Sequence, residues 1–199
     1  SIKNAVALKP VLVISVAAGI SIQRIETWFG GQPAVVRVMP NTPALIGAGI
    51  SGLFANSQVT LDGRENAAQV MKAVGNIVWL QNEGELDLVT AVSGSGPAYF
   101  FYLMEAIERV AVSEGLDPTT ARTLTVETAI GAGRLALASS DSLAVLREQV
   151  TSPGGTTEAA INSLDESQVS KSVGRAVNAA KDRSEELSQL LGTEDRDKT

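Results

Sequence analysis

The chain has 199 residues, of which 44% are hydrophobic, and it carries a formal net charge of −6 with an isoelectric point near 4.8. This acidity argues against binding to nucleic acid or to an anionic membrane, because phosphates require a basic face. The sequence contains neither cysteine nor histidine, which excludes disulfides, thiolate nucleophiles, serine–histidine triads and the commonest zinc ligands. Its chemistry must therefore use hydroxyls, carboxylates, lysines or a cofactor, and we expect no metal site.

The first predicted elements form a β-α-β unit. Residues 3–9 are predicted to end a helix, and the β-branched run 11–16 predicts a buried strand. This run also resembles the core of a signal peptide, but it is far shorter than the roughly 20 residues that a membrane span needs. Ser21 is a suitable N-cap for a helix over residues 22–29. Residues 34–39 then predict a second strand, parallel to the first.

Two loops follow these strands at their carboxyl ends, where open α/β sheets bind their ligands. The first loop contains residues 17–19 and the second contains residues 40–44. We therefore predict cofactor contacts from these loops and the strand end, by Ala17, Ala18, Gly19, Met39, Asn41 and Pro43. Asn41 lies between two prolines, so an Asx turn is an equally good interpretation of this residue.

Residues 47–52 match the pattern G-x-G-x-x-G of dinucleotide-binding turns. We do not assign them that role, because they follow a proline-rich segment instead of a strand and lead toward a turn instead of a helix. Residues 62–74 predict an amphipathic helix, and residues 77–80 predict a closing strand. The apolar face of this helix is expected to comprise Ala67, Val70, Met71 and Val74.

From Gly84 onward the pattern predicts helices. We expect them over residues 87–92, 97–114, 117–138, 141–149, 155–164 and 166–191, followed by a disordered tail over residues 193–199. The long last helix should bury Val169, Val173, Ala176, Val177, Ala180, Leu187 and Leu190. The aromatic run Tyr99 to Tyr102 indicates core and subunit interface more than a cofactor site, and the stripe Phe100, Leu103, Met104 and Ile107 predicts self-association. Glu127 is expected to be solvated or salt-bridged, although a buried functional carboxylate is the alternative.

The turn Ser152-Pro153-Gly154-Gly155-Thr156-Thr157 precedes one of these helices. Its proline and glycines allow a tight reversal, and Thr156 or Thr157 is predicted to cap the helix. Backbone N–H groups at a helix N-terminus bind carboxylates or phosphates. The turn is therefore a candidate anion site, although such turns also serve as plain helix–helix connections.

Four segments of the chain resemble, in the same order, blocks of pyrroline-5-carboxylate reductases. They are Val13 to Ile20, Arg37 to Pro43, Thr90 to Phe101 and Leu146 to Asp165. The resemblance implies an enzyme that reduces 1-pyrroline-5-carboxylate to proline with NADH or NADPH, the last step of proline biosynthesis. It also implies a cytoplasmic oxidoreductase that forms dimers and decamers, without nucleic-acid or membrane partners.

The resemblance divides the chain into two predicted domains. Residues 1–82 would be the C-terminal part of a Rossmann-like NAD(P)-binding domain, and residues 83–199 a helical dimerisation and substrate-binding domain like that of 6-phosphogluconate dehydrogenases. The fold class is therefore α/β plus all-α. Because the family begins with a phosphate loop and further strands that do not occur here, we expect a truncated chain that is inactive alone. The alternative is that a separate chain supplies the missing half. The choice between NAD and NADP would be set by residues that precede Ser1.

The resemblance also gives the anion site a role. The substrate carboxylate would be bound by Ser152, Gly154, Gly155, Thr156 and Thr157. The Thr157 hydroxyl would bind the imine nitrogen or relay its proton, although an ordered water would serve as well. One alternative is another NAD(P)-dependent dehydrogenase of the hydroxyacid or 6-phosphogluconate type, for whose catalytic lysine the nearest candidate is Lys171, outside any such motif. The other alternative is a non-catalytic oligomerisation fragment.

Overall fold

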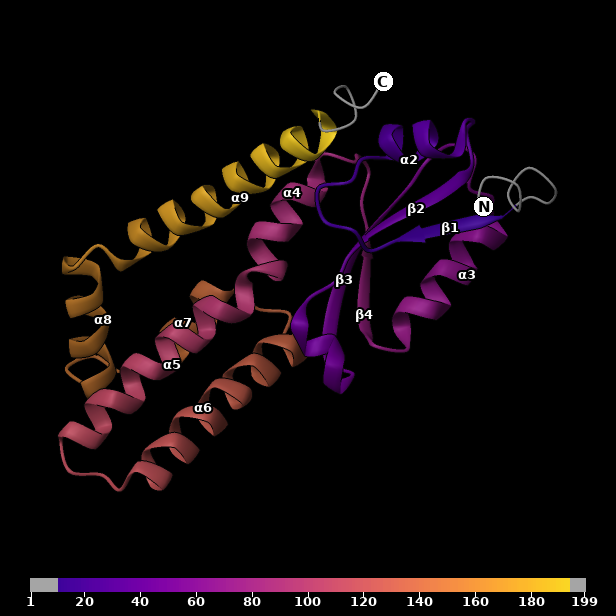
Figure 1. The fold of residues 1–199 in the computed structure, drawn as a ribbon. Coiled ribbons are helices and arrows are strands. Elements are labelled where there is room, and N and C mark those ends of the chain that lie inside the picture. The colour runs from indigo at the N-terminus through magenta and orange to yellow at the C-terminus, as the bar shows by residue number, and fades with distance from the viewer. Residues whose placement is uncertain (1–10, 194–199) are drawn as a thin grey trace. The chain divides into compact units, whose positions relative to one another are not determined.

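The computed structural model describes residues 11–193, and these fold into two compact units (Figure 1). The first unit comprises the chain up to Pro97 together with residues from Ala176 onward, and the second comprises Ala98–Arg175. The domain boundary predicted after residue 82 stays a prediction, because compactness divides the chain at other positions. The helix predicted at residues 3–9 and the tail from residue 194 lie outside the described residues.

Within residues 11–193, the first unit contains one sheet of four strands in the order β1-β2-β3-β4. The strands are Leu12–Ser15 (β1), Ala34–Met39 (β2), Gly49–Ala55 (β3) and Gly75–Trp79 (β4). β1 is parallel to β2, β2 is antiparallel to β3, and β3 is parallel to β4. The predicted β-α-β unit is therefore confirmed. The chain reverses between β2 and β3 through the short 3₁₀ helix η1 (Thr42–Ile46), which ends at Gly47 with a left-handed φ of 72°.

Helix α2 (Ile22–Phe29) connects β1 to β2 and has the bounds that its sequence predicts. The hydroxyl of Ser21 accepts a hydrogen bond from the N–H of Arg24 at 3.2 Å, which is an N-cap. Ile22 and Ile25 are buried in a cluster with Val35 of β2. The alternation of side chains along β2 places this cluster on one face of the sheet.

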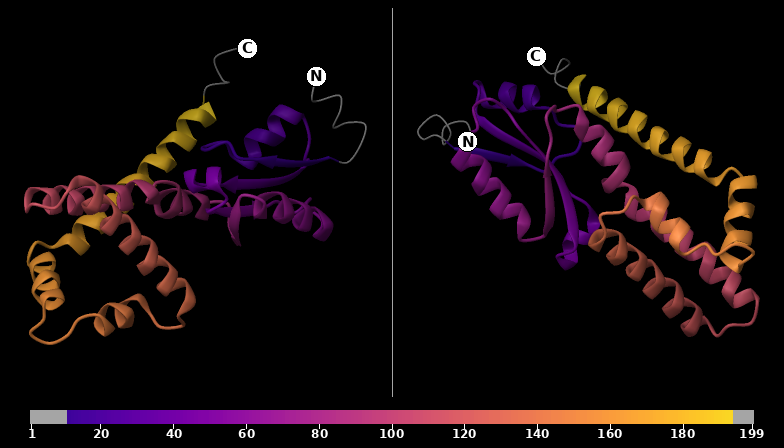
Figure 2. Two further views of the ribbon diagram at one scale, coloured as in Figure 1. Left: turned by 90° about the horizontal axis from the view of Figure 1, so that it is seen from below. Right: turned by 180° about the vertical axis from the view of Figure 1, so that it is seen from behind.

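Helix α3 (Leu61–Lys72) covers the other face, and Figure 2 shows α2 and α3 on opposite sides of the strands. Its Ala67 and Met71 are buried against β2 and β3 in a cluster that also contains Val36, Val38 and Leu53. Val70 was predicted to share this buried face, but 57% of it is exposed. Ala67 and Met71 belong to the buried cluster, and Val70 is not among the side chains that pack against it.

The remaining elements are helical. Helix α4 (Glu85–Val89) continues directly into the π-helical turn η2 (Thr90–Gly94), where a single helix over 87–92 was predicted. The helices that follow are α5 (Gly96–Ser113), α6 (Pro118–Ala138), α7 (Leu143–Gln149), α8 (Thr156–Glu166) and α9 (Val169–Thr193). The carboxylate of Asp117 accepts the N–H of Thr120 at 3.0 Å and so caps α6. Among the described residues, no helix combines the length and the apolarity needed to cross a membrane.

Apolar side chains of α9 that were predicted to be buried are exposed in the single chain, and so is Phe100 of the α5 stripe that was predicted to self-associate. Exposed fractions are 63% for Phe100 on α5, 52% for Val173 and 40% for Leu187 on α9. Glu127 on α6 is exposed, as the solvated interpretation predicted. Apolar faces of this size need a covering surface, and in one copy of the chain these residues have none that buries them.

Candidate functional site

The turn before α8 has the tight reversal that its proline and glycines predict. Gly154 has a left-handed φ of 69°, and the N–H of Gly155 donates to the carbonyl oxygen of Ser152 at 2.9 Å. Gly155 is the N-cap residue of α8 and makes no side-chain capping bond. The prediction that Thr156 or Thr157 caps the helix is therefore wrong, because both residues already lie within its first turn.

The start of α8 presents backbone donors to a ligand. The first N–H groups of a helix have no intrahelical acceptor, and within residues 11–193 no hydrogen bond engages those of Thr156, Thr157 and Glu158. The N–H of Gly155 was also predicted to bind the ligand, but it is occupied by Ser152. The available donors are therefore displaced along the helix by one residue from the predicted set.

Glu158 is a residue that the sequence analysis missed. Its carboxylate accepts the N–H of Gly154 at 2.7 Å and so ties the first turn of α8 back to the glycine turn. The signal in the sequence is a glutamate three residues after the N-cap, the spacing of a capping box. Here the glutamate reaches the residue before the cap, Gly154, instead of the cap itself.

The two side-chain hydroxyls predicted to help at this site are differently placed. Ser152 and Thr156 are exposed, whereas Thr157 is half-buried at the start of α8. Among the described residues, no hydrogen bond engages the hydroxyl of Thr157. This hydroxyl is therefore available for a ligand.

The predicted cofactor edge lies in the first unit, at the carboxyl ends of β1 and β2. A small cavity there is lined by residues from both strand ends and from α4, η2 and α9, which are Ala17, Ala18, Gly19, Arg37, Val38, Met39, Leu86, Asp87, Thr90 and Ser184. Four of the predicted cofactor residues thus gather around one cavity, namely 17–19 and Met39. Asn41 and Pro43 do not line it. The Asn41 side-chain oxygen instead accepts the N–H of Ile50 on β3 at 3.0 Å, and this bond ties η1 to the sheet.

An ion pair lies at this edge of the sheet. Arg37 of β2 donates to a carboxylate oxygen of Glu83 at 2.7 Å, and the two side chains are only 12% and 30% exposed. The same oxygen accepts the N–H of Ile22 at 2.7 Å, so Glu83 also neutralises the N-terminus of α2. Because a carboxylate already occupies that helix terminus, α2 does not offer a phosphate site. Glu83 is not among the site residues that the sequence predicts.

Helix α9 also contributes side chains to this edge of the first unit. The buried hydroxyl of Ser184 donates to Asp87 at 2.6 Å. Gly19 has a φ of 74°, and a Cβ added there would lie 2.9 Å from Leu191 and 3.6 Å from the backbone of Leu187. The turn after β1 therefore needs glycine both for its backbone angle and for the close approach of α9.

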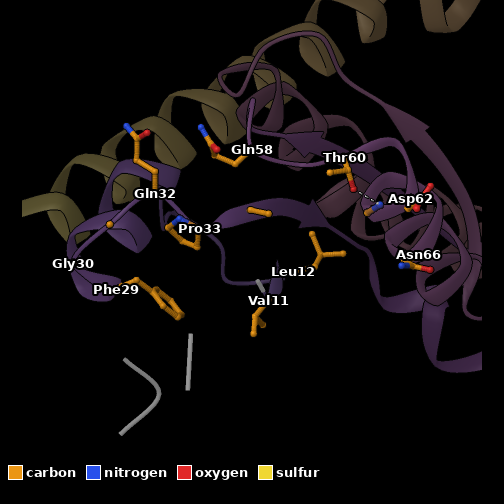
Figure 3. Close-up of a pocket in the computed structure, with 13 residues that line it drawn as sticks. Val11, Leu12, Phe29, Gly30, Gln32, Pro33, Gln58, Thr60, Asp62 and Asn66 are labelled. Carbon is orange, nitrogen blue, oxygen red and sulfur yellow. Dashed lines mark hydrogen bonds between the residues drawn. The ribbon is translucent and has the colours of Figure 1, made fainter. Parts of the chain in front are cut away.

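A separate pocket of about 590 Å³ lies at the amino ends of β1 and β2 (Figure 3). Among the residues that the structure describes, its polar side chains are amides, a hydroxyl and the carboxylate of Asp62, without a lysine or arginine. It lies at the end of the sheet opposite to the predicted cofactor edge. Residues 49–52 of the G-x-G-x-x-G pattern form part of strand β3 and open no helix, so they make no dinucleotide-binding turn.

Comparisons with known proteins identify the family. A family model described as pyrroline-5-carboxylate reductase dimerisation matches residues 83–187. The pyrroline-5-carboxylate reductase of Pseudomonas aeruginosa is 51% identical over 187 residues, which cover 94% of this chain and 68% of that protein. The enzyme of Vibrio alginolyticus is 43% identical over 181 residues, with 90% of this chain and 66% of that protein covered. The chain belongs to the pyrroline-5-carboxylate reductase family.

Solved structures of the family have the same fold. A pyrroline-5-carboxylate reductase from Coxiella burnetii superposes with a TM-score of 0.90 at 43% identity, over 94% of this chain and 69% of that one. The Plasmodium falciparum pyrroline carboxylate reductase, solved with NADP bound, gives a TM-score of 0.86 at 30% identity, over 94% of this chain and 73% of that one. This chain therefore spans about two thirds of the length of its relatives.

Membership of the pyrroline-5-carboxylate reductase family confirms the predicted fold class and the predicted class of enzyme, an NAD(P)H-dependent oxidoreductase. The alternative of a hydroxyacid or 6-phosphogluconate dehydrogenase is not favoured, because relatives across several bacteria carry the reductase name. The dimerisation domain supports self-association. The roles predicted for individual site residues stay predictions.

Proposed function

We propose that this chain supplies the substrate-binding turn and part of the cofactor edge of an enzyme that reduces 1-pyrroline-5-carboxylate to proline. The observation that carries the assignment is the start of α8, where the N–H groups of Thr156, Thr157 and Glu158 have no acceptor among the described residues. An anionic substrate carboxylate is the ligand that such donors bind, through charge-assisted hydrogen bonds of about 1.5–3 kcal/mol each.

The glycine turn keeps these donors accessible. Gly154 and Gly155 have no side chains to cover them, and a Cβ on Gly155 would lie 2.9 Å from the carbonyl oxygen of Ser152. Glu158 holds the turn by its bond to Gly154, so its carboxylate is turned toward the loop. A substrate carboxylate therefore binds to a turn that is already formed, and little ordering is needed on binding.

The cofactor edge fits part of a dinucleotide. The exposed residues Ala17 and Ala18 have small side chains, so a flat ligand can approach the backbone at the end of β1. Met39 supplies an apolar surface at the end of β2, next to this turn. A bound nicotinamide supplies the hydride, because no amino-acid side chain can donate one.

The chemistry left to the protein is orientation and the handling of one proton. The half-buried hydroxyl of Thr157 is free to hydrogen-bond the imine nitrogen and to hold a proton there. A protonated imine needs no strong acid, which agrees with the absence of a histidine. An ordered water is the alternative donor, and the kinetics of a Thr157 variant separate the two.

Self-association belongs to the same proposal. The apolar stripe on α5 is covered by a second copy of the chain, in a dimer that can assemble further into a decamer. The fully cysteine-free sequence suits the reducing cytoplasm, where we place the enzyme.

The test of this function is a reductase assay on the protein expressed at the full length of its gene. We expect pyrroline-5-carboxylate to be reduced with oxidation of NADH or NADPH, and no turnover of 2-hydroxy acids. Proline should inhibit in competition with the imine. Turnover of hydroxy acids without reduction of the imine would reject the proposal in favour of the dehydrogenase alternative.

A further inference from the structure

Met39 lies where β2 reaches the predicted cofactor edge. It is the last residue of β2, pairs with Gly52 on β3, and is half-buried. Its side chain lines the small cavity together with the turn 17–19. Unlike the neighbouring valines of β2, methionine has three rotatable side-chain bonds, so its position depends on what packs against it.

The π-helical turn η2 packs against this strand end. The N–H of Ser95 donates to the carbonyl oxygen of Thr90 at 2.8 Å, and the hydroxyl of Thr90 donates to the carbonyl oxygen of Leu86 at 2.8 Å. A Cβ added to Gly52 would lie 2.8 Å from a methyl group of Val89, which shows how closely α4 approaches the sheet. Hydrogen bonds within the segment thus hold the π-helical turn, and α4 packs closely against β3 at Gly52.

Gly94, the last residue of η2, is in contact with Met39. A Cβ added to Gly94 would lie 2.6 Å from the terminal methyl carbon of Met39, whereas its next neighbours on Thr90 would be at ordinary distances of 3.7 and 3.9 Å. The backbone of Gly94 does not have a positive φ. Glycine is therefore needed at this position for space and not for its backbone conformation.

We propose that Gly94 is a positioning residue that, by its missing side chain, sets the conformation of Met39 at the cofactor edge. This inference rests on the proposed function, because it assigns Met39 to the surface that meets the dinucleotide. A methyl group at position 94 displaces the end of the Met39 side chain from the η2 side. The cofactor then meets a differently shaped apolar surface.

The contact predicts that Gly94→Ala weakens cofactor binding without lowering the stability of the fold. The atom that Gly94→Ala would displace is the far end of a flexible side chain, which can change rotamer without moving the backbone. The variant should therefore fold normally. Its defect should appear in the KM for NADPH, and kcat should change less.

The experiment is a double-mutant cycle in the protein expressed at the full length of its gene, with reductase kinetics and thermal melting as readouts. We expect Gly94→Ala to raise the KM for NADPH by about three- to tenfold, and to change it by less than about 1.5-fold in a Met39→Val background, where the terminal methyl is missing. Gly84→Ala is the matched control, because a Cβ at Gly84 meets nothing within 4 Å. The same increase in both backgrounds, or no increase in either, would overturn the role of Gly94.

NMR of ¹³C-methyl-labelled methionine separates this proposal from the one on which it rests. The Met39 signal, assigned with Met39→Leu, should shift in Gly94→Ala without any ligand and should shift again on addition of NADPH. A wild-type protein that neither binds NADPH nor reduces the imine would overturn the proposed function, and this proposal with it. Normal wild-type turnover with an unshifted Met39 signal in Gly94→Ala would overturn the positioning role alone.

Discussion

The carboxylate of Glu83 connects two elements at the cofactor edge, strand β2 and helix α2. It accepts hydrogen bonds from Arg37 of β2 and from the N–H of Ile22 at the start of α2, both at 2.7 Å. Arg37 is only 12% exposed, so loss of its partner would leave a largely buried charge without compensation.

We therefore expect Glu83→Gln to lower the free energy of unfolding by about 1–3 kcal/mol. Chemical denaturation followed by circular dichroism measures this loss. Glu186→Gln is the control, since the ion pair between Glu186 and Arg183 is 60% exposed on both sides and its removal should cost less than about 0.5 kcal/mol. Equal losses of unfolding free energy in the two variants would contradict the larger contribution expected from the ion pair of Glu83 and Arg37.

Thr157 is the residue whose chemistry is most directly testable. Its hydroxyl makes no hydrogen bond with the described residues and Gly155 occupies the N-cap position, so no capping bond is lost in Thr157→Ala. If the hydroxyl acts on the imine nitrogen, kcat should fall by about 10- to 100-fold while the melting temperature changes little. An unchanged kcat in steady-state assays would assign proton delivery to water.

At the scale of the element, periodicity predicted most of the helices and strands. Helix α2 and strand β2 have their predicted bounds, because Ser21 and the β-branched run give unambiguous local signals. The predicted helix over 87–92 was wrong in detail, because the structure has α4 over Glu85–Val89 followed by a π-helical turn over Thr90–Gly94, and apolar periodicity does not distinguish these two types of helix. Val70 was misplaced for a similar reason, since periodicity identifies an apolar face but not the width of its contact.

The candidate site could be predicted in type but not in detail. The sequence predicts a glycine turn before a helix, and the structure has one. It does not predict that the N–H of Gly155 is consumed by Ser152, or that Glu158 and Glu83 turn toward backbone N–H groups. These assignments depend on side-chain conformations that follow from packing in three dimensions.

The hydrogen bonds of Glu85 at the start of α4 predict that the stability of the fold depends on pH. The carboxylate of Glu85 accepts the N–H groups of Asn82 and Gln81 at 3.2 and 2.8 Å. These backbone hydrogen bonds, the one from Asn82 first, lower the pKa of Glu85 below its ordinary value of 4.5. A group whose pKa is lower in the folded state adds stability above its unfolded pKa and loses it as the pH falls through the folded pKa.

Wild-type protein should accordingly melt at a higher temperature than Glu85→Gln at neutral pH. The difference should shrink as the pH falls below 4.5, when the carboxyl becomes protonated. Scanning calorimetry between neutral and acidic pH checks this, with Glu186→Gln again as the control. A difference that stays constant across the range would contradict the assigned hydrogen bonds to the charged form.

At the scale of the whole molecule, the exposed apolar stripe on α5 predicts association between copies. Phe100, Leu103 and Ile107 of this stripe are 63%, 54% and 49% exposed, and Val110, about one turn beyond Ile107, is 60% exposed. The family model that matches this region is a dimerisation model. Leu103→Asp places a charge in the stripe and should weaken the dimer by at least about tenfold in Kd. Sedimentation equilibrium measures this, and Leu61→Asp on α3 should leave the mass unchanged because Leu61 lies in the sheet unit. A wild-type mass of one chain at micromolar concentration would reject the interface.

The central claim is that the start of α8 binds the substrate carboxylate. The most direct test is a crystal structure of the protein, expressed at the full length of its gene, with proline bound. The carboxylate oxygens should lie within about 2.7–3.2 Å of the backbone nitrogens of Thr156 and Thr157. A carboxylate bound by arginine or lysine side chains away from α8, with these N–H groups facing only solvent, would contradict the account.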